Sequence, residues 1–166
     1  MIVVKPSYLI DTRSARTVTD VCPSKQDLLD ATERHIDDVR NAMAFFACRL
    51  LKAAMLHDHT KVDDIDGFYA AYQDAFNGIS SFTGSPFNTA HLASERHHLL
   101  EHVPDDVNLI DVIERIADTV MANTGRGGGT GLFFDSMDAD LLQKAYTNTV
   151  YLLQGEVVFD DSAEDA

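Results

Sequence analysis

The chain has 166 residues, of which 45% are hydrophobic, and a formal net charge of −14 at pH 7. This composition predicts one folded, soluble domain, and the sequence has neither an apolar run of about 18 residues nor a secretory signal pattern. Because the acidic charge repels nucleic-acid backbones, we expect a cytoplasmic protein that binds neither a membrane nor duplex nucleic acid.

The first helix is predicted to follow an irregular N-terminal segment over residues 1–22, which opens with a short apolar stretch. Pro23 and Ser24 open this helix, with Ser24 as the N-cap and Asp27 as its partner three residues on. Apolar residues then recur at three- and four-residue steps, which is a helical pattern: Ile36, Val39, Met43, Phe46 and Leu50. Cys22 and Cys48 lack C-x-x-C spacing and are expected to be buried or free thiols.

Further helices are predicted over residues 68–76, from 88 or 89 to about 102, over 108–121 and over 138–153. The aromatic residues of the helix over 68–76 are expected in the core: Phe68, Tyr69, Tyr72 and Phe76. The glycine-rich segment 125–131 lacks the ending of a phosphate-binding P-loop and is interpreted as a lid or connector. Residues 2–4 and 157–158 are the only convincing strand segments, and 156–166 are expected to form an acidic tail. The sequence thus predicts an all-α domain over residues 23–155.

The segment His57-Asp58-His59-Thr60-Lys61 is the strongest indication of chemistry. His57 and Asp58 offer a metal one neutral nitrogen and one anionic oxygen, and Lys61 offers a charge to a phosphate. His35 and Asp118 are candidate further ligands. A straight helix would separate His35 from His57 by roughly 33 Å. A shared metal therefore requires the chain to turn back near residues 47–53, where no Gly or Pro marks a turn.

All seven histidines lie between residues 35 and 102, a concentration that metal sites often explain. On a helix over residues 89–102, one stripe would carry His91, Glu95, His98 and His102. His98 and His102 have the four-residue spacing that lets two imidazoles share a metal. The alternative is a polar helix face whose histidines only titrate, and the spacing by itself favours this alternative.

Acidic residues form a similar stripe on the helix over residues 108–121. Asp111, Glu114 and Asp118 are spaced at i, i+3 and i+7, and Arg115 fits a solvated face. The spacing alone favours that solvated face. The alternative is that Asp118 points into a site between helices.

These residues resemble a known superfamily. His35, then His57-Asp58, then Asp118 in a late helix is similar to the H…HD…D signature of HD-domain metal-dependent phosphohydrolases. The H-D-x-x-K form, which ends at Lys61, resembles branches whose lysine faces substrate phosphate. Segments 96–114 and 148–150 resemble an uncharacterised bacteriophage family of HD-like proteins. The resemblance covers roughly residues 30–155 and implies an HD-domain-like bundle of about five to seven helices.

The resemblance also implies a ligand set for a divalent metal ion, with Mn, Fe, Co, Ni, Zn and Mg all compatible with mixed His and carboxylate ligands. The implied ligands are His35, His57, Asp58 and Asp118. His91 and His98, or its neighbour His97, match the histidines that some HD proteins use for a second metal or for phosphate. Helical phase favours His98 over His97.

The function implied by the resemblance is hydrolysis of a nucleotide or related phosphate ester. Lys61 would bind the phosphate and neutralise charge, and Asp58, Glu114 or Asp111 would orient the attacking water. We expect a small-molecule phosphate partner in the cytoplasm, which would be that of an infected bacterium if the chain is phage-encoded, and homo-oligomerisation stays open. The alternative is a non-catalytic acidic interaction protein on an HD-like fold, such as a phage inhibitor of a host factor. Convergence of the four implied ligands on one metal would favour the enzyme.

Overall fold

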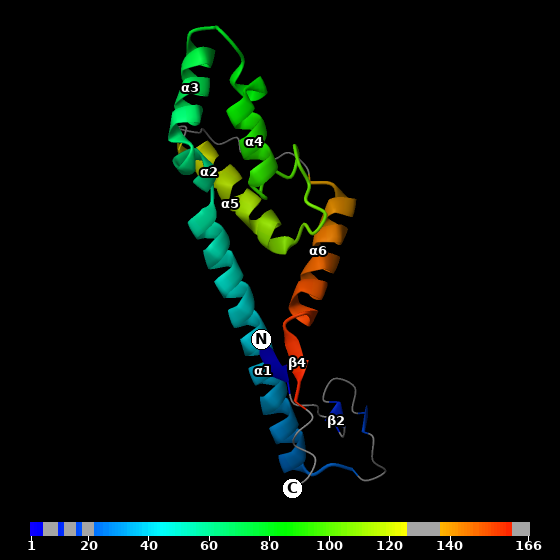
Figure 1. Ribbon diagram of the computed structural model, residues 1–166. Coiled ribbons are helices and arrows are strands. Elements are labelled where there is room, and N and C mark those ends of the chain that lie inside the picture. Colours follow the sequence, from blue (N-terminus) through cyan, green and yellow to red (C-terminus); the bar gives the residue numbers. More distant parts are fainter. Residues whose placement is uncertain (5–9, 12–15, 18–21, 126–136, 161–166) are drawn as a thin grey trace. The chain divides into compact units, whose positions relative to one another are not determined.

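Helices account for most of the chain that the computed structural model describes, which comprises residues 1–4, 10–11, 16–17, 22–125 and 137–160 (Figure 1). The helices are α1 (Lys25–Leu56), α2 (His59–Asp63), α3 (Ile65–Phe76), the 3-10 helix η1 (Phe82–Gly84), α4 (Pro86–Ser94), α5 (Leu109–Gly125) and α6 (Ala139–Gln154). The strands are β1 (Ile2–Val4), β2 (Ile10–Asp11), β3 (Arg16–Thr17) and β4 (Val157–Phe159). The predicted all-α class and number of helices are confirmed.

The chain divides differently from the predicted single domain over residues 23–155. It forms a terminal unit, Met1–Cys48 with Val150–Ala166, and a central unit, Arg49–Thr149. In the terminal unit β1 lies parallel to β4 with Ile2 opposite Val157, and β2 pairs antiparallel with β3 (Figure 1). The two predicted strand segments therefore pair with each other, and the first residues of the expected acidic tail belong to β4. The rest of that tail, residues 161–166, lies outside the described residues, as does most of the glycine-rich segment.

Helix α1 begins where the sequence predicts and continues much further than the metal hypothesis allows. Ser24 and Asp27 cap it reciprocally, because Asp27 N donates to Ser24 Oγ at 3.2 Å and Ser24 N donates to Asp27 Oδ2 at 2.9 Å. The helix then runs without interruption to Leu56. The predicted turn near residues 47–53 is therefore wrong, since that segment is built of good helix formers such as Ala, Leu, Arg and Lys.

Helix α3 ends as predicted and α4 does not. Asn77 caps the C-terminus of α3, and Gly78 follows with a φ of +69°, a conformation that glycine adopts readily. Helix α4 is capped by Ser85, whose side chain accepts a hydrogen bond from Asn88 N. It stops at Ser94, and Glu95 has an extended backbone, so the predicted helix to residue 102 is wrong. The histidines after Glu95 consequently lie on turns.

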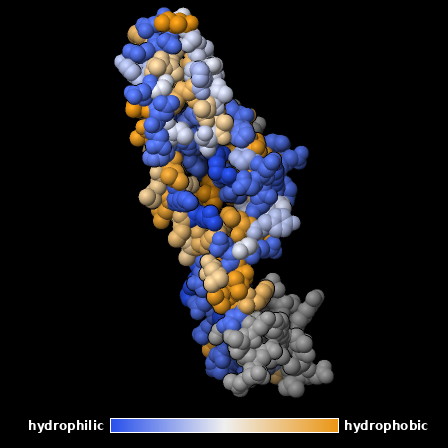
Figure 2. All heavy atoms as spheres, in the orientation of Figure 1, coloured by the Kyte–Doolittle hydropathy of each residue, from blue (hydrophilic) through white to orange (hydrophobic). Residues whose placement is uncertain are grey.

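The aromatic residues of α3 are mostly on the surface. Phe68 packs against Phe87 with ring centroids 5.0 Å apart, as a core residue should. Tyr69, Tyr72 and Phe76 are exposed, which contradicts the prediction of an aromatic core. Apolar and polar residues are interspersed over the visible surface (Figure 2).

The core of the central unit forms where α5 begins beside α6. The buried residues Leu99, Val107, Val112 and Ala145 pack together. Thr149 Oγ1 accepts a hydrogen bond from Leu109 N at 2.8 Å, and Asn148 Nδ2 donates to Val107 O at 2.8 Å. Side chains of α6 therefore satisfy backbone groups at the start of α5, which fixes the position of that helix start.

Two further sequence predictions concern the surface and the membrane. Cys22 and Cys48 are exposed free cysteines, as expected for two isolated thiols. No helix among the described residues is both long enough and apolar enough to cross a membrane.

The neighbouring residues Leu99 and Leu100 test this core directly. Leu99 is 2% exposed and Leu100 is 54% exposed. We expect Leu99→Ala to lower the free energy of unfolding by about 3 kcal/mol, because it leaves a cavity in the core. Leu100→Ala should change it by less than about 0.5 kcal/mol. Urea denaturation followed by circular dichroism measures both, and equal effects would contradict the assignment of this core.

Candidate metal centre

The centre starts from the sharp turn between α1 and α2. Helix α1 ends at Leu56, and Asp58 has φ 54° and ψ 21°, in the left-handed region, immediately before α2 begins at His59. Aspartate is among the residues that tolerate this conformation. The turn directs the adjacent His57 and Asp58 side chains into one site, which two successive residues of a regular helix would not do.

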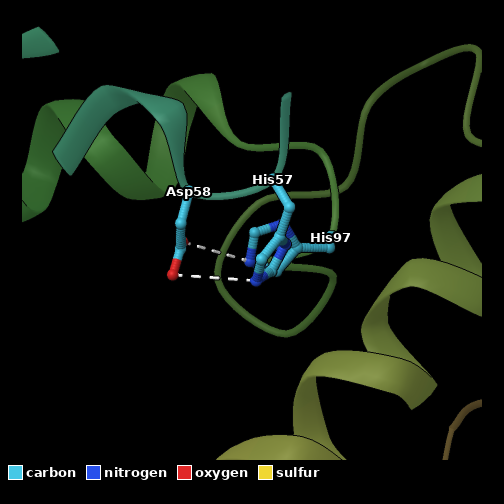
Figure 3. Close-up of side chains that lie close together, drawn as sticks. All are labelled: His57, Asp58 and His97. Atoms are coloured by element: carbon cyan, nitrogen blue, oxygen red, sulfur yellow. Dashed lines mark ion pairs between the residues drawn. The ribbon is translucent and has the colours of Figure 1, made fainter. Parts of the chain in front are cut away.

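A first group of candidate ligands comprises His57, Asp58 and His97, whose ligand atoms all lie within 4.8 Å of one another. The two imidazoles face the Asp58 carboxylate (Figure 3). His57 Nε2 lies 3.7 Å from Asp58 Oδ2, and His97 Nε2 lies 3.7 Å from Asp58 Oδ1. His57 Nε2 is also 3.5 Å from Asp118 Oδ1 on α5. Ligands that share one ion at about 2.1 Å are separated by roughly 3 to 4 Å, so this spacing suits a metal.

A second group comprises Asp58, His91 and His98 and also satisfies the 4.8 Å limit. His91 Nε2 lies 2.9 Å from His98 Nε2 and 3.4 Å from Asp58 Oδ1. Asp58 belongs to both groups. Asp58 would therefore contribute a ligand to an ion held by either group.

Three buried polar atoms in this region have no hydrogen-bond partner: Asp58 Oδ1, His97 Nδ1 and His97 Nε2. His97 Nδ1 lies 3.1 Å from Glu114 Oε1, but the contact has the distance of an ion pair without hydrogen-bond geometry. Buried polar groups are costly when unsatisfied, and native proteins seldom leave several together. A cation between Asp58 and His97 would satisfy one atom of each residue, so the donor set fits a metal.

Glu114 lies behind two of the imidazoles. Its Oε1 is 3.0 Å from His57 Nδ1 and 3.1 Å from His97 Nδ1. Burial works to raise the pKa of Glu114, but its contacts with His97 and His57 outweigh burial and lower the pKa. The ionised carboxylate accepts a hydrogen bond from His57 Nδ1, which leaves His57 Nε2 free as a ligand. This location favours a role in orienting histidines over the predicted role in orienting water.

A comparable relay orients His91. Thr60 Oγ1 donates to the buried Glu95 at 2.6 Å, and the same hydroxyl oxygen lies 2.7 Å from His91 Nδ1. Thr60 N also donates to Glu95 Oε1 at 3.0 Å. Because the Thr60 hydroxyl donates its hydrogen bond to Glu95, its oxygen accepts a hydrogen bond from His91 Nδ1. The lone pair of His91 Nε2 is then directed at Asp58 and His98.

Burial prepares two of the histidines for metal binding. It lowers the pKa of His98 to about 4, helped by the nearby charges of His97 and His91. Burial also lowers the pKa of His91, and the charge of Lys61 adds to this effect. Both imidazoles are therefore neutral at pH 7, which is the form that binds a metal.

The surroundings of His97 and Asp58 shift the pKa of each side chain toward its charged form. Burial works to lower the pKa of His97, but Glu114, Asp58 and Asp118 outweigh it and raise the pKa. Burial likewise opposes ionisation of Asp58, while the hydrogen bond and charge of Lys61, followed by His57 and His91, lower its pKa. Lys61 Nζ donates to Asp58 Oδ2. The lysine predicted to bind phosphate is thus paired with the central carboxylate.

Arg96 holds the turn that carries His97 and His98. Its guanidinium donates to both oxygens of the buried Asp111, each at 2.8 Å, and to Asp106 Oδ1 at 3.0 Å. Asp111 Oδ2 also accepts from Asn108 N at 2.9 Å, at the start of α5. The acidic stripe of α5 is therefore not the solvated face that its spacing favours. It faces Arg96 and the histidines.

The structure brings together most of the predicted site residues. His57, Asp58, Asp118, His91, His97 and His98 meet in the central unit. Both His97 and His98 face the site, so the preference for His98 alone was wrong. His59 is half exposed, lies 3.3 Å from Asp63 and belongs to neither group of candidate ligands.

His35 and His102 lie elsewhere. His35 belongs to the terminal unit, and the uninterrupted α1 separates it from His57 by roughly 33 Å, so this helix cannot bring the two together. His102 is exposed. The roles of Thr60, Glu95 and Arg96 do not follow from the spacing of residues in the sequence. The sequence indicates only that Thr60 lies close to the His57-Asp58 pair along the chain.

Comparison of the chain with protein-family models, with curated proteins and with solved structures finds no significant match. The resemblance to HD-domain phosphohydrolases therefore remains a prediction from sequence. Three of the four residues of its signature do lie close together. Asp58 and Asp118 are within ion-pair distance of His57, at 3.7 and 3.5 Å from its Nε2 atom.

The relay through Thr60 leads to a test by metal binding. Thr60→Val keeps the side-chain shape and removes the hydroxyl, so His91 and Glu95 lose their shared partner. We expect the affinity for Mn²⁺ or Zn²⁺ to fall about tenfold in isothermal titration calorimetry. Thr124→Val is the control, because the Thr124 hydroxyl bonds only a carbonyl within α5, Val120 O, at 2.8 Å. Unchanged metal binding by Thr60→Val would contradict the relay.

The Arg96 contacts lead to a test of stability. Arg96→Met leaves the buried Asp111 without its partner and should lower the free energy of unfolding by about 2 kcal/mol. The pKa of Asp106 is lowered chiefly by its hydrogen bond to Arg96, so this contribution is present at neutral pH and lost as the pH falls through the lowered pKa. The difference in the free energy of unfolding between Arg96→Met and the wild type should therefore become smaller at acidic pH. Arg40→Met, at an exposed pair with Asp37, should change stability by less than about 0.5 kcal/mol.

Proposed function

We propose that this chain is a metal-dependent phosphohydrolase that acts on a nucleotide or related phosphate ester. One observation carries the proposal: two groups of metal-ligating side chains share the Asp58 carboxylate, and polar atoms of Asp58 and His97 are buried there without hydrogen-bond partners. Two ions bridged by a carboxylate suit the displacement of a phosphate ester, in which charge builds on both the attacking and the leaving oxygen.

The donor set supports a transition metal over magnesium. Three imidazoles besides His57 lie around Asp58, namely His91, His97 and His98. Mg²⁺ prefers oxygen ligands and retains several waters, whereas Mn, Fe, Co, Ni and Zn accept imidazole nitrogen. When bound, the ion would lower the pKa of a coordinated water and polarise a phosphoryl oxygen. We propose Mn, Fe, Co, Ni or Zn as the cofactor.

The protein side chains have separate roles in this proposal. Asp58, Asp118 and the four histidines hold the cofactor. Glu114 and the Thr60–Glu95 pair fix which imidazole nitrogen is available. Lys61, one-third exposed and bonded to Asp58, is placed to exchange part of that contact for a non-bridging oxygen of the phosphate.

The interaction-protein alternative is less well supported. An inhibitor that acts through its negative surface needs exposed carboxylates. Exposed carboxylates such as Glu33, Asp66 and Asp74 are present, but those of Glu114, Glu95 and Asp111 are turned inward, onto histidines, Thr60 and Arg96. Burying charged groups in this way is costly and serves no acidic docking surface.

Purified protein assayed with a nucleotide and phosphate-ester panel plus Mn²⁺, Co²⁺ or Zn²⁺ should release phosphate, and a chelator should stop the release. His57→Ala and Asp58→Asn should each lower kcat/KM at least about a hundredfold, because they remove several kcal/mol of metal-derived stabilisation. His35→Ala should retain activity, since α1 keeps His35 away from the site.

Metal content is measured for each variant together with activity, so that loss of the metal can be distinguished from loss of catalysis alone. Loss of both metal and activity in His57→Ala supports the proposal. Absence of phosphate release with every metal, together with wild-type metal content in His57→Ala and Asp58→Asn, would exclude it. Loss of activity in His35→Ala would reinstate His35 as a ligand.

A further inference from the structure

An apolar cavity of about 390 Å³ opens beside the metal centre, between the end of α1 and the middle of α5. Its apolar lining consists of Leu50, Ala53, Ala54, Ile113, Ala117 and Met121. The volume lies within the range of small-molecule sites, which runs from about 300 to 1,000 Å³. All of these residues belong to the central unit.

The cavity and the metal centre share a wall. His57, Glu114 and Asp118 line the cavity, and His57 Nε2 is 3.5 Å from Asp118 Oδ1 and 3.7 Å from Asp58 Oδ2. A ligand whose polar end reaches the metal centre therefore places the rest of its body against the apolar walls of α1 and α5.

The charge of this shared wall limits the chemistry of the part of the ligand that lies in the cavity. Among the residues that the structure describes, the lining contains two carboxylates, Glu114 and Asp118, and no lysine or arginine. Lys61 is not among the lining residues and is bonded to Asp58. Beyond the ions that Asp118 would help to hold, further phosphates in the cavity would meet Glu114 and apolar side chains, with no lysine or arginine among the described lining residues to bind them. An uncharged apolar group would instead lose only its contact with water, which is favourable.

We propose that the cavity binds the alcohol part of the substrate, and that this substrate is a phosphate monoester of an uncharged, largely apolar alcohol rather than a di- or triphosphate. The inference rests on the proposed function. In the reaction the oxygen of water forms a bond to phosphorus and the bond from phosphorus to the alcohol oxygen breaks. A proton from the water passes to the leaving alkoxide, which gives the free alcohol and inorganic phosphate.

Ethyl phosphate and n-hexyl phosphate test the proposal because their leaving groups have similar chemistry and differ in apolar surface. With Mn²⁺ we expect kcat/KM for hexyl phosphate to exceed that for ethyl phosphate at least about tenfold. Ala117→Phe fills the cavity from α5 and Ala54→Phe fills it from α1, so each should bring the ratio toward one. The control Ala70→Phe, on an exposed position of α3, should keep the wild-type ratio.

Binding of the non-hydrolysable ethylphosphonate and hexylphosphonate to the Mn²⁺-loaded protein separates this inference from the proposed function. Tighter binding of hexylphosphonate, lost in both cavity-filling variants, supports the cavity even if no ester is hydrolysed. Hydrolysis of both esters at equal kcat/KM, with equal binding of the two phosphonates, overturns the inference and leaves the proposed function standing. Preference for adenosine triphosphate over adenosine monophosphate also overturns it. Circular dichroism confirms that each variant is folded.

Discussion

The central unit depends on keeping the charged carboxylate of Asp58 half-buried among imidazoles. Such a group is stable only if other charges compensate it, and Lys61 supplies one of them. The geometry of the chain follows from this requirement: α1 must end at Leu56, and Asp58 must take a left-handed conformation to turn its side chain inward. The histidines surround the carboxylate, with His57 Nε2 nearest to Oδ2 and with His91 Nε2 and His97 Nε2 nearest to Oδ1.

Each histidine needs a partner behind it, and these partners connect the elements of the unit. Glu114 links α5 to His57 at the end of α1, and Glu95 links the end of α4 to Thr60 on α2. Arg96 then ties the turn after Glu95 to the start of α5. Residues 95–98 could not make these contacts from a continuing helix, because successive side chains would point about 100° apart. The early end of α4 is thus a consequence of the site.

Local chemistry in the sequence predicted several helix ends, and long-range contacts decided others. The Ser24–Asp27 cap and the end of α3 at Asn77-Gly78 involve residues within a few positions of each other, so the sequence alone predicts them. The stripe of His91, Glu95 and His98 fitted a helix equally well, and only partners on α2 and α5 exclude it. Likewise, spacing alone made Asp111 a solvated residue, because its partner Arg96 lies fifteen positions away. Asp118 was predicted from the family resemblance and not from its spacing.

The charges of the site also set an order of binding for the proposed reaction. Asp58, Glu95, Glu114 and Asp118 outnumber the one lysine of the site, Lys61, so without cations the region repels a phosphate. Divalent ions on the shared carboxylate would reverse that sign locally, even in a chain with a net charge of −14. Phosphate can then be attracted only after the metal is bound. The phosphate of a bound ester would then face the ions, and its uncharged part would face the apolar side chains of the cavity that His57, Glu114 and Asp118 also line.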